Sequence, residues 1–277
     1  MIVTYIRSSS YNNYDFCQMQ YFLTYVLGWR SDSGKKAEMG TMAHKVMEVL
    51  AGLKKFQQDN PRKKYLVVND DKCGKIREHQ DKLHTGEFVD RLTEKAISDY
   101  AKDSRHKFYR KERAEIRQTV ETFLTWNDGQ FDPRLRNIYY PEPHFDIPIE
   151  EEWAKFDFVD AHGKQQTGQL AIKGTIDLVT LVNEETIEVV DWKSGRRLDW
   201  ATGEEKTYEK MWGDPQLLLY FYAMSKMFPE FYKNKFEGES NCMCRSVEKS
   251  LKEEGMDVVL EKYTAPDFNI GFYEAPG

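Results

Sequence analysis

Apolar residues recur at helical spacing through much of the first half of the chain. Two stretches with this period, "YNNYDFCQMQYFLTYVL" and "MGTMAHKVMEVLAGLKKF", predict amphipathic helices, the first of them capped by Ser10 and ended at Gly28. Residues 57–85 are polar and contain several turn formers, which predicts a loop or an insertion. Helical spacing then returns in an apolar face that consists of Ile116, Val120, Phe123 and Leu124.

From about residue 145 the pattern changes to that of strands. The segments "HFDIPIEEEWAKFDFVD", "QLAIKGTIDLVTLV" and "ETIEVVDWKS" predict three successive strands. A helix follows in "GDPQLLLYFYAMSKMF", with Asp214 as its N-cap and Pro215 at its first position. This order favours an α/β architecture, in which helices cover the faces of a sheet and further helices form an N-terminal elaboration.

The composition of the chain restricts its class. Hydrophobic residues at 40% and charged residues at 31% are typical of a folded globular protein. No apolar run is long enough to span a membrane, and the N-terminal apolar stretch is too short for a secretory signal. Four cysteines are too few for a disulfide framework, which predicts a reducing compartment, the cytoplasm. The net charge of −6 neither favours nor excludes a nucleic-acid partner, because local patches matter more than the sum.

Two acidic residues and a lysine interrupt the apolar pattern of the last two strands. If residues 183–185 form a three-residue loop, Asp177 lies directly opposite Asp191 in an antiparallel pair, and Lys193 points to the same face as Asp191. Facing carboxylates repel each other, and a divalent cation such as Mg²⁺ or Mn²⁺ would remove this repulsion. A two-residue loop would instead place the acids on opposite faces. The alternative is that both acids are ordinary solvated residues at strand ends. An Asp-x-Lys triplet alone also occurs by chance in many proteins.

The segments "KGTIDLV" and "IEVVDWKSG" resemble the G-x-x-D…(D/E)-x-K core of the PD-(D/E)XK nuclease superfamily. Three further segments are similar to its RecB-like branch, which includes AddB-type and CRISPR-adaptation nucleases. "SSSYNNYDFCQMQYFLTYVLGW" resembles the Ser-rich aromatic segment of that branch, "GTMAHKVMEVL" its G-x-x-x-H helix, and "QLLLYFYA" its Q-x-x-x-Y helix. Asp191 stands where many superfamily members have Glu, although the RecB-like branch often has Asp there.

The resemblance implies a restriction-endonuclease-like core, which is a central mixed sheet flanked by helices. Residues 1–277 would form a single nuclease domain, in which residues 1–140 are the mainly helical elaboration and residues 141–277 the catalytic sheet core. It further implies a metal-dependent DNA exonuclease for recombination, repair or degradation in a bacterial or phage-infected cell. DNA is the expected partner, together with a helicase or recombination protein.

The same resemblance assigns roles to individual residues. The metal would be bound by His44, Asp177, Asp191 and the carbonyl of Trp192. Lys193 would orient or deprotonate the attacking water and offset charge in the transition state. Gly40 and Ala43 leave room for the close approach of a strand or phosphate near His44. The alternative for His44 is an ordinary helix histidine satisfied by hydrogen bonds.

Substrate-binding residues are expected on both sides of the hairpin. Gln216 and Tyr220 are four residues apart and share a helix face, from which they would hold Lys193 or the DNA; alternatively they are a first-turn polar residue and a core aromatic residue. Arg196 and Arg197 follow the strand and are placed to hold phosphates. The basic run "RHKFYRKERAEIR" at residues 105–117 predicts either a DNA-contacting surface or a solvated helix face.

An iron–sulfur cluster is not expected. Some RecB-like nucleases bind one with a cysteine before the nuclease core and three after it. Cys17 matches the first position, but only Cys242 and Cys244 follow the core, and such clusters usually require four thiolates. Reduced free thiols are therefore expected.

Two other classes of function are consistent with parts of the pattern. A nuclease fold that grips DNA or a partner without cutting would be marked by loss of an acid or of the lysine, and Asp177, Asp191 and Lys193 are all present. An unrelated hydrolase or structural α/β protein would leave Asp177 unpaired.

Overall fold

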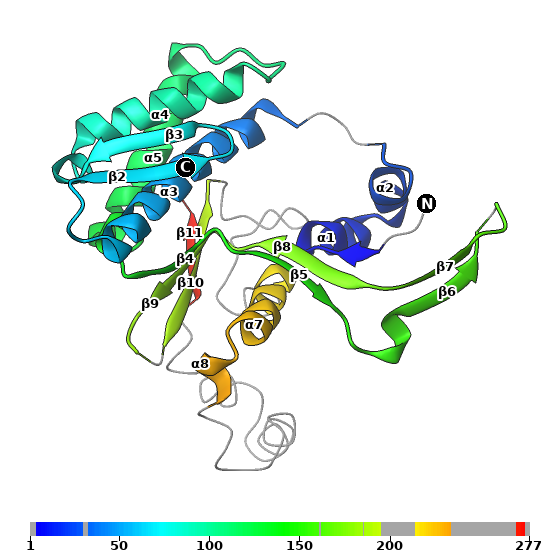
Figure 1. Cartoon of the computed structure of the whole chain (residues 1–277). Helices are drawn as coiled ribbons and strands as arrows, with labels where there is room; N and C mark the ends of the chain where they lie inside the picture. Colours follow the sequence, from blue (N-terminus) through cyan, green and yellow to red (C-terminus); the bar gives the residue numbers. More distant parts are fainter. Residues whose placement is uncertain are drawn as a thin grey trace, which may run out of the picture.

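The computed structural model describes residues 4–29, 33–160, 162–184, 186–194, 214–233 and the strand at 270–274. Two small sheets lie at its centre (Figure 1). One has the order β11 (Ile270–Glu274), β10 (Ile187–Lys193), β9 (Leu178–Leu181), β4 (Ile138–Pro141). The other has the order β1 (Tyr5–Ile6), β8 (Ala171–Thr175), β5 (His144–Pro148). Both sheets are mixed, because β10 pairs parallel with β11 and β1 pairs parallel with β8, while the other pairs are antiparallel.

A shared bend joins the two sheets. The chain passes from β4 to β5 and from β8 to β9 within a few residues, and the backbone holds the two passages together. The N–H of Glu142 donates to the carbonyl of Asp177 at 3.2 Å, and the N–H of Ile176 donates to the carbonyl of Pro143 at 3.1 Å. Glu142 has a positive φ of 46°, which a residue other than glycine adopts rarely and only where the turn requires it. Asp177 therefore lies at the corner between the sheets.

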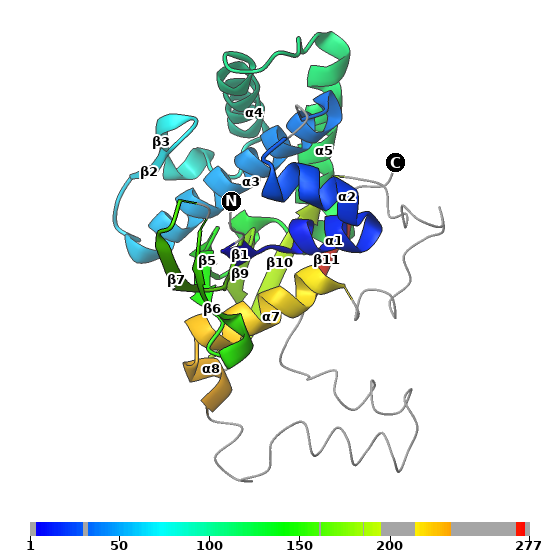
Figure 2. The ribbon, with the colours of Figure 1, turned by 90° about the vertical axis from the view of Figure 1, so that its right-hand side faces the viewer.

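Helices cover the two faces of the β9–β10 hairpin. On one face α3 (Lys35–Asp59) packs with α4 (Gly86–Ala101) and α5 (Arg110–Gly129); α7 (Pro215–Met227) covers the other (Figure 2). The strand residues alternate accordingly. The α3 face buries Leu178, Val190 and Trp192, whereas the α7 face buries Val179, Ile187 and Val189. This alternation has the two-residue period of a strand buried on both sides.

The register of this hairpin is the one that the three-residue loop predicts. Val190 pairs with Leu178, and Val189 pairs with Val179. The ladder ends there, and the next pair in this register would be Asp191 with Asp177. The predicted helix over the QLLLY segment is also confirmed, since Asp214 accepts a hydrogen bond from the N–H of Gln216 at 2.8 Å and Pro215 opens the helix.

The N-terminal helix begins earlier and is more broken than its pattern predicts. It comprises α1 (Ser8–Phe16), α2 (Gln18–Tyr21) and the π-helical turn η1 (Phe22–Val26), and Cys17 between α1 and α2 is extended. Arg7, not Ser10, is the N-cap; the hydroxyl of Ser10 instead accepts from the N–H of Arg7 and donates to its carbonyl. Gly28, with a φ of +72°, ends this helical segment as expected.

The predicted loop at residues 57–85 is instead a β-hairpin. Strands β2 (Tyr65–Asp70) and β3 (Gly74–His79) pair antiparallel and precede a short 3-10 turn, η2 (Gln80–Lys82). Leu66 and Ile76 join the core beneath α3. Few apolar residues lie on the buried face of this hairpin, and the positions around them are polar or turn-forming. The alternation of apolar and polar residues was therefore too weak to predict two strands.

A second hairpin interrupts the first predicted strand of the sheet core. After β5 the chain forms a 3-10 turn, η4 (Glu152–Ala154), and then β6 (Lys155–Val159), which pairs with β7 (Gln165–Gln169). This hairpin extends away from the rest of the chain (Figure 1). The remaining short elements are η3 (Pro133–Leu135) and α8 (Glu230–Lys233). None of the described helices has the length and hydropathy of a membrane span.

One glycine on β8 allows the sheet to pack against α7. Gly174 faces Phe145 across the β5–β8 pair, and a Cβ at Gly174 would clash with the Phe145 ring. That ring is buried and packs edge-on to Tyr220, with ring centroids 6.3 Å apart. We therefore expect Gly174→Ala to lower the free energy of unfolding by about 1–3 kcal/mol, as overpacked cores do, in urea titrations.

Gly168 provides a matched control. It lies on β7, and a Cβ there would meet the Phe156 ring in the same way. Phe156 is only half-buried on the extended hairpin, so its ring can swing into solvent. Gly168→Ala should change the free energy of unfolding much less, and an equal loss in both variants would contradict the explanation.

Candidate active site

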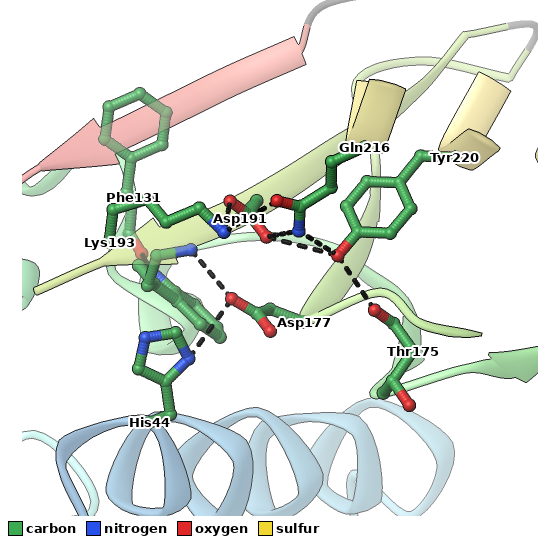
Figure 3. A network of polar contacts seen from close by, with 9 residues as sticks. His44, Phe131, Thr175, Asp177, Asp191, Lys193, Gln216 and Tyr220 are labelled. Atoms are coloured by element: carbon green, nitrogen blue, oxygen red, sulfur yellow. Dashed lines mark hydrogen bonds and ion pairs between the residues drawn. The ribbon is translucent and has the colours of Figure 1, made fainter. Parts of the chain in front are cut away.

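Side chains from four parts of the chain meet at the end of the β9–β10 hairpin (Figure 3). Asp177 comes from the bend between the sheets, Asp191 and Lys193 from β10, and His44 from α3. Gln216 and Tyr220 reach the same place from the first turns of α7. The structure thus brings together six of the side chains that the sequence singles out.

Asp191 is the buried centre of this group. Its Oδ1 accepts hydrogen bonds from Gln216 Nε2 at 3.0 Å and from Tyr220 Oη at 3.3 Å. Its Oδ2 is buried and forms an ion pair with the ammonium of Lys193 at 2.5 Å. The pKa of Asp191 is raised from 3.8 to about 6, chiefly by burial and in smaller part by the charge of Asp177, while the charge of Lys193 opposes the shift.

Asp177 is more accessible and has different partners. Its Oδ2 accepts from the backbone N–H of Trp192 at 2.8 Å and lies 3.3 Å from Nδ1 of His44. The N–H and C=O of one strand residue point to the same side, so the carbonyl of Trp192 is directed toward Asp177 as well. The Trp192 side chain itself is fully buried on the α3 face. Asp177 therefore contacts the imidazole of His44 and the backbone of Trp192 through the same carboxylate oxygen, and Asp191 lies near enough for its pKa to be affected by the charge of Asp177.

Gln216 connects the lysine to the buried acid. Its Oε1 accepts from Lys193 Nζ at 3.2 Å, while its Nε2 donates to Asp191 and to Tyr220 Oη, the latter at 2.6 Å. Tyr220 Oη in turn donates to the carbonyl of Thr175 at 2.9 Å or to Asp191 (Figure 3). Burial raises the pKa of Tyr220, so its hydroxyl remains a donor. Thr175 was not predicted, because it contributes a backbone carbonyl that no side-chain pattern reveals.

The close approach predicted near His44 is made by the end of β10. A Cβ on Gly40 would lie 2.5 Å from Oγ of Ser194, so the absence of a side chain at Gly40 lets the strand end lie against α3. One turn further along α3, His44 packs edge-on against Phe123 and Trp192. These contacts hold the imidazole in place beside Asp177.

A second acidic group lies one helical turn beyond His44. Glu48, Asp70 and Asp71 each have a carboxylate oxygen within 4.8 Å of the others, a spacing that a metal ion could bridge. The ammonium of Lys45 already lies between them, 3.1 Å from Asp70 and 3.0 Å from Asp71, and pairs with Glu48. Burial and the neighbouring Glu142 raise the pKa of Glu48 to about 8. The lysine therefore offsets part of the negative charge of this group from within the protein.

Other predicted contact residues are engaged elsewhere or lie outside the described residues. In the basic run, Arg113 and Arg117 both pair with Glu94. Arg196, Arg197, Cys242 and Cys244 lie outside the described residues. Cys17 is half-buried and Cys73 is buried, and both are free; burial raises the pKa of Cys73 to about 12.

Comparison with known proteins agrees with this geometry. A family model described as the PD-(D/E)XK nuclease superfamily matches residues 8–268. None of the curated proteins compared with the chain is similar enough to count as a match. The mixed α/β architecture confirms the fold class that the sequence predicts, and members of this superfamily cut nucleic acids with the help of divalent metals. The chain therefore belongs to the PD-(D/E)XK nuclease superfamily.

Proposed function

We propose that the protein is a Mg²⁺- or Mn²⁺-dependent deoxyribonuclease of the RecB-like branch, and that it acts as an exonuclease on DNA. The observation that supports this most directly is the meeting of Asp177, Asp191 and Lys193 at one end of a hairpin. Along the chain, the His44 helix comes first, the acidic hairpin second and the Gln216–Tyr220 helix third. This order is similar to that of the RecB-like branch and supports the assignment to it.

The donor set fits a hard divalent cation. In this proposal the ligands are Asp177, Asp191, the carbonyl of Trp192 and His44, and the oxygen-rich set matches the preference of Mg²⁺ and Mn²⁺. The buried Oδ2 of Asp191 lies 2.5 Å from the ammonium of Lys193, and a bound ion would share this oxygen with the lysine. A bound ion supplies a water of lowered pKa and neutralises charge on the scissile phosphate.

Lys193 acts on the substrate side of the site. Its ammonium is half-buried, held by Asp191 and Gln216, and from there it orients the attacking water and offsets charge in the phosphorane-like transition state. Gln216 and Tyr220 hold Lys193 and Asp191 in place and line the path of the DNA. Arg196 and Arg197 are proposed to hold phosphates beyond the strand end.

The biological setting follows from the branch. We propose that the enzyme works in the cytoplasm of a bacterial or phage-infected cell, in recombination, repair or degradation of DNA, with a helicase or recombination protein as partner. The contrasting function is a module that binds DNA without cutting it. Binding of DNA without cleavage by the wild-type protein in Mg²⁺ or Mn²⁺ would favour that function.

The metal site can be tested by calorimetry. Titration of Mn²⁺ into the wild-type protein should show binding that Asp177→Asn abolishes, because this change removes one of the two carboxylate ligands. Asp71→Asn is the control, since Asp71 belongs to the group around Lys45. Loss of Mn²⁺ binding in Asp71→Asn but not in Asp177→Asn would move the metal to that second group.

Removing the charge of Asp191 should separate catalysis from stability. Asp191→Asn keeps acceptors for Gln216 and Tyr220 but loses the charge, so cleavage should fall by more than about a hundredfold. Because the folded-state pKa of about 6 exceeds the ordinary value of 3.8, the folded wild-type protein binds the proton more tightly than the unfolded chain. The contribution of Asp191 to stability without metal therefore falls as the pH rises from about 4 to 6.

The measurement is the melting temperature of both proteins in EDTA across this pH range. Asp191→Asn should match the wild type near pH 4 and exceed it above pH 6. Glu188→Gln is the contrasting control, since Glu188 is buried on the same strand but pairs with Arg136 and accepts from Thr180, so its loss should destabilise. A marked drop for Asp191→Asn at pH 7 would show that Asp191 is a structural ion-pair residue.

The exonuclease assignment predicts dependence on free DNA ends. The α3–α5 layer and α7 flank the acidic hairpin on both sides, and a flanked site admits a free strand end more readily than a continuous duplex. Linear DNA should be degraded in Mg²⁺ or Mn²⁺ while covalently closed circles survive, and blocked ends should protect. Rapid nicking of closed circles by the wild type but not by Lys193→Ala would establish an endonuclease instead.

A further inference from the structure

A pocket of about 310 Å³ lies beside Tyr220, next to the acidic hairpin. Its polar walls come from three separate segments, which are the β1–α1 junction, β5 and β8. The polar lining residues are Arg7, Ser8, Ser9, His144, Lys173 and Thr175. We call it the β8-edge pocket. None of these residues was assigned a role by the sequence motifs.

The pocket exists because β1 leaves the sheet early. Strand β1 pairs with β8 only at Ala171 and Ile172, and the chain then turns into α1 at Ser8. The edge of β8 beyond Ile172 is left uncovered by a strand. The carbonyl of Thr175 is turned to this edge, where it accepts from Tyr220, and the N–H of the same strand residue points to the same side.

The chemistry of the lining favours an anion. Arg7 and Lys173 contribute positive charge, His144 adds a ring whose Nδ1 lies 2.7 Å from the hydroxyl of Thr175, and no carboxylate lines the pocket. Lys173 pairs with Asp146 at 2.6 Å, but Asp146 is not part of the lining. Within the described residues, Arg7 has no carboxylate at ion-pair distance, so its charge is available to a ligand.

Hydroxyl and backbone donors complete the set. Ser8 and Ser9 form the first turn of α1, whose N-terminus carries partial positive charge, and the edge of β8 adds the Thr175 N–H. Two cationic side chains combined with several hydroxyl and N–H donors are the groups that proteins use to bind phosphate oxygens. Carboxylate ligands would use fewer of these donors, since they present two oxygens instead of three or four.

We propose that the β8-edge pocket binds a phosphate group of the substrate DNA strand, adjacent to the phosphodiester that is cut. Tyr220 connects the two places, because it lines the pocket and its hydroxyl also reaches Asp191. A strand whose neighbouring phosphate sits in the pocket would be held in register with the acidic hairpin. The inference rests on the proposed nuclease function and names a binding subsite for its substrate.

The test compares a pocket variant with a control matched in charge. The pocket variant is Arg7→Gln with Lys173→Gln. The control is Arg62→Gln with Lys55→Gln, because Arg62 is exposed like Arg7, and Lys55 and Lys173 each pair with an aspartate and are each 34% exposed. Binding of a fluorescent single-stranded oligonucleotide is measured by anisotropy in EDTA over a range of KCl concentrations, and cleavage is measured in Mg²⁺.

The pocket variant should bind about tenfold more weakly than the control, and its plot of log affinity against log salt should be shallower by about 0.7 for each phosphate that the protein no longer neutralises. Lys173→Arg alone should keep the wild-type affinity, which separates loss of charge from misfolding, and melting temperatures check the fold of each variant. Pocket and control variants with the same affinity and salt slope would overturn the inference.

Oligonucleotides with a 5′-phosphate, a 3′-phosphate or two hydroxyl ends identify the source of the phosphate. If one terminal phosphate strengthens binding to the wild type but not to the pocket variant, the pocket holds that end; if neither does, the pocket holds an internal phosphate. A wild type that cuts DNA while the pocket variant equals the control refutes only the pocket. A wild type that neither binds nor cuts DNA refutes the proposed function and the pocket together.

Discussion

The antiparallel register between β9 and β10 is the constraint on which the rest of the site depends. With Val189 opposite Val179, one face of the hairpin packs under α7 and the other under α3, and both acids fall at the same end of the pair. A slip of one residue would turn Asp191 into the α3 core and Trp192 toward α7. Because both faces are buried, the register is held by the apolar residues, and the acids take their positions from it.

Strand β10 contains two buried acids, Glu188 and Asp191, whose surroundings differ. Glu188 pairs with Arg136 and accepts from Thr180, so it is satisfied inside the protein. Asp191 accepts hydrogen bonds on one oxygen and pairs with Lys193 on the other, but burial and the nearby charge of Asp177 still raise its pKa. A buried carboxylate with a raised pKa and an acidic neighbour is more typical of a functional site than of a structural ion pair.

The site is assembled at the corner between the two sheets. The bend at Asp177 brings the acid out of the ladder, so that its carboxylate reaches His44 on α3 while its backbone accepts from Glu142. The same corner leaves the carbonyl of Thr175 facing Tyr220 on α7. Because β1 ends just before this corner, the edge of β8 beyond Ile172 has no strand beside it, and the β8-edge pocket lies there, beside Tyr220.

The sequence by itself predicted the helices α3 and α7, the apolar face of α5, and the strands of the acidic hairpin, whose register it left to the length of the loop. Their apolar periods are long and regular, as in α3, and the turn chemistry is explicit, as at Asp214 and Pro215. It missed the hairpin at Tyr65–Asp70 and Gly74–His79, where few apolar residues mark the buried face. Only the tertiary structure decided the break at Cys17 and the bend at Asp177. It also decided that Lys45 pairs with the second acidic group, and that the Thr175 carbonyl and the Trp192 N–H bond to side chains of the site. These features rest on backbone groups and on contacts between residues distant in the chain, and neither leaves a periodic trace in the order of the side chains.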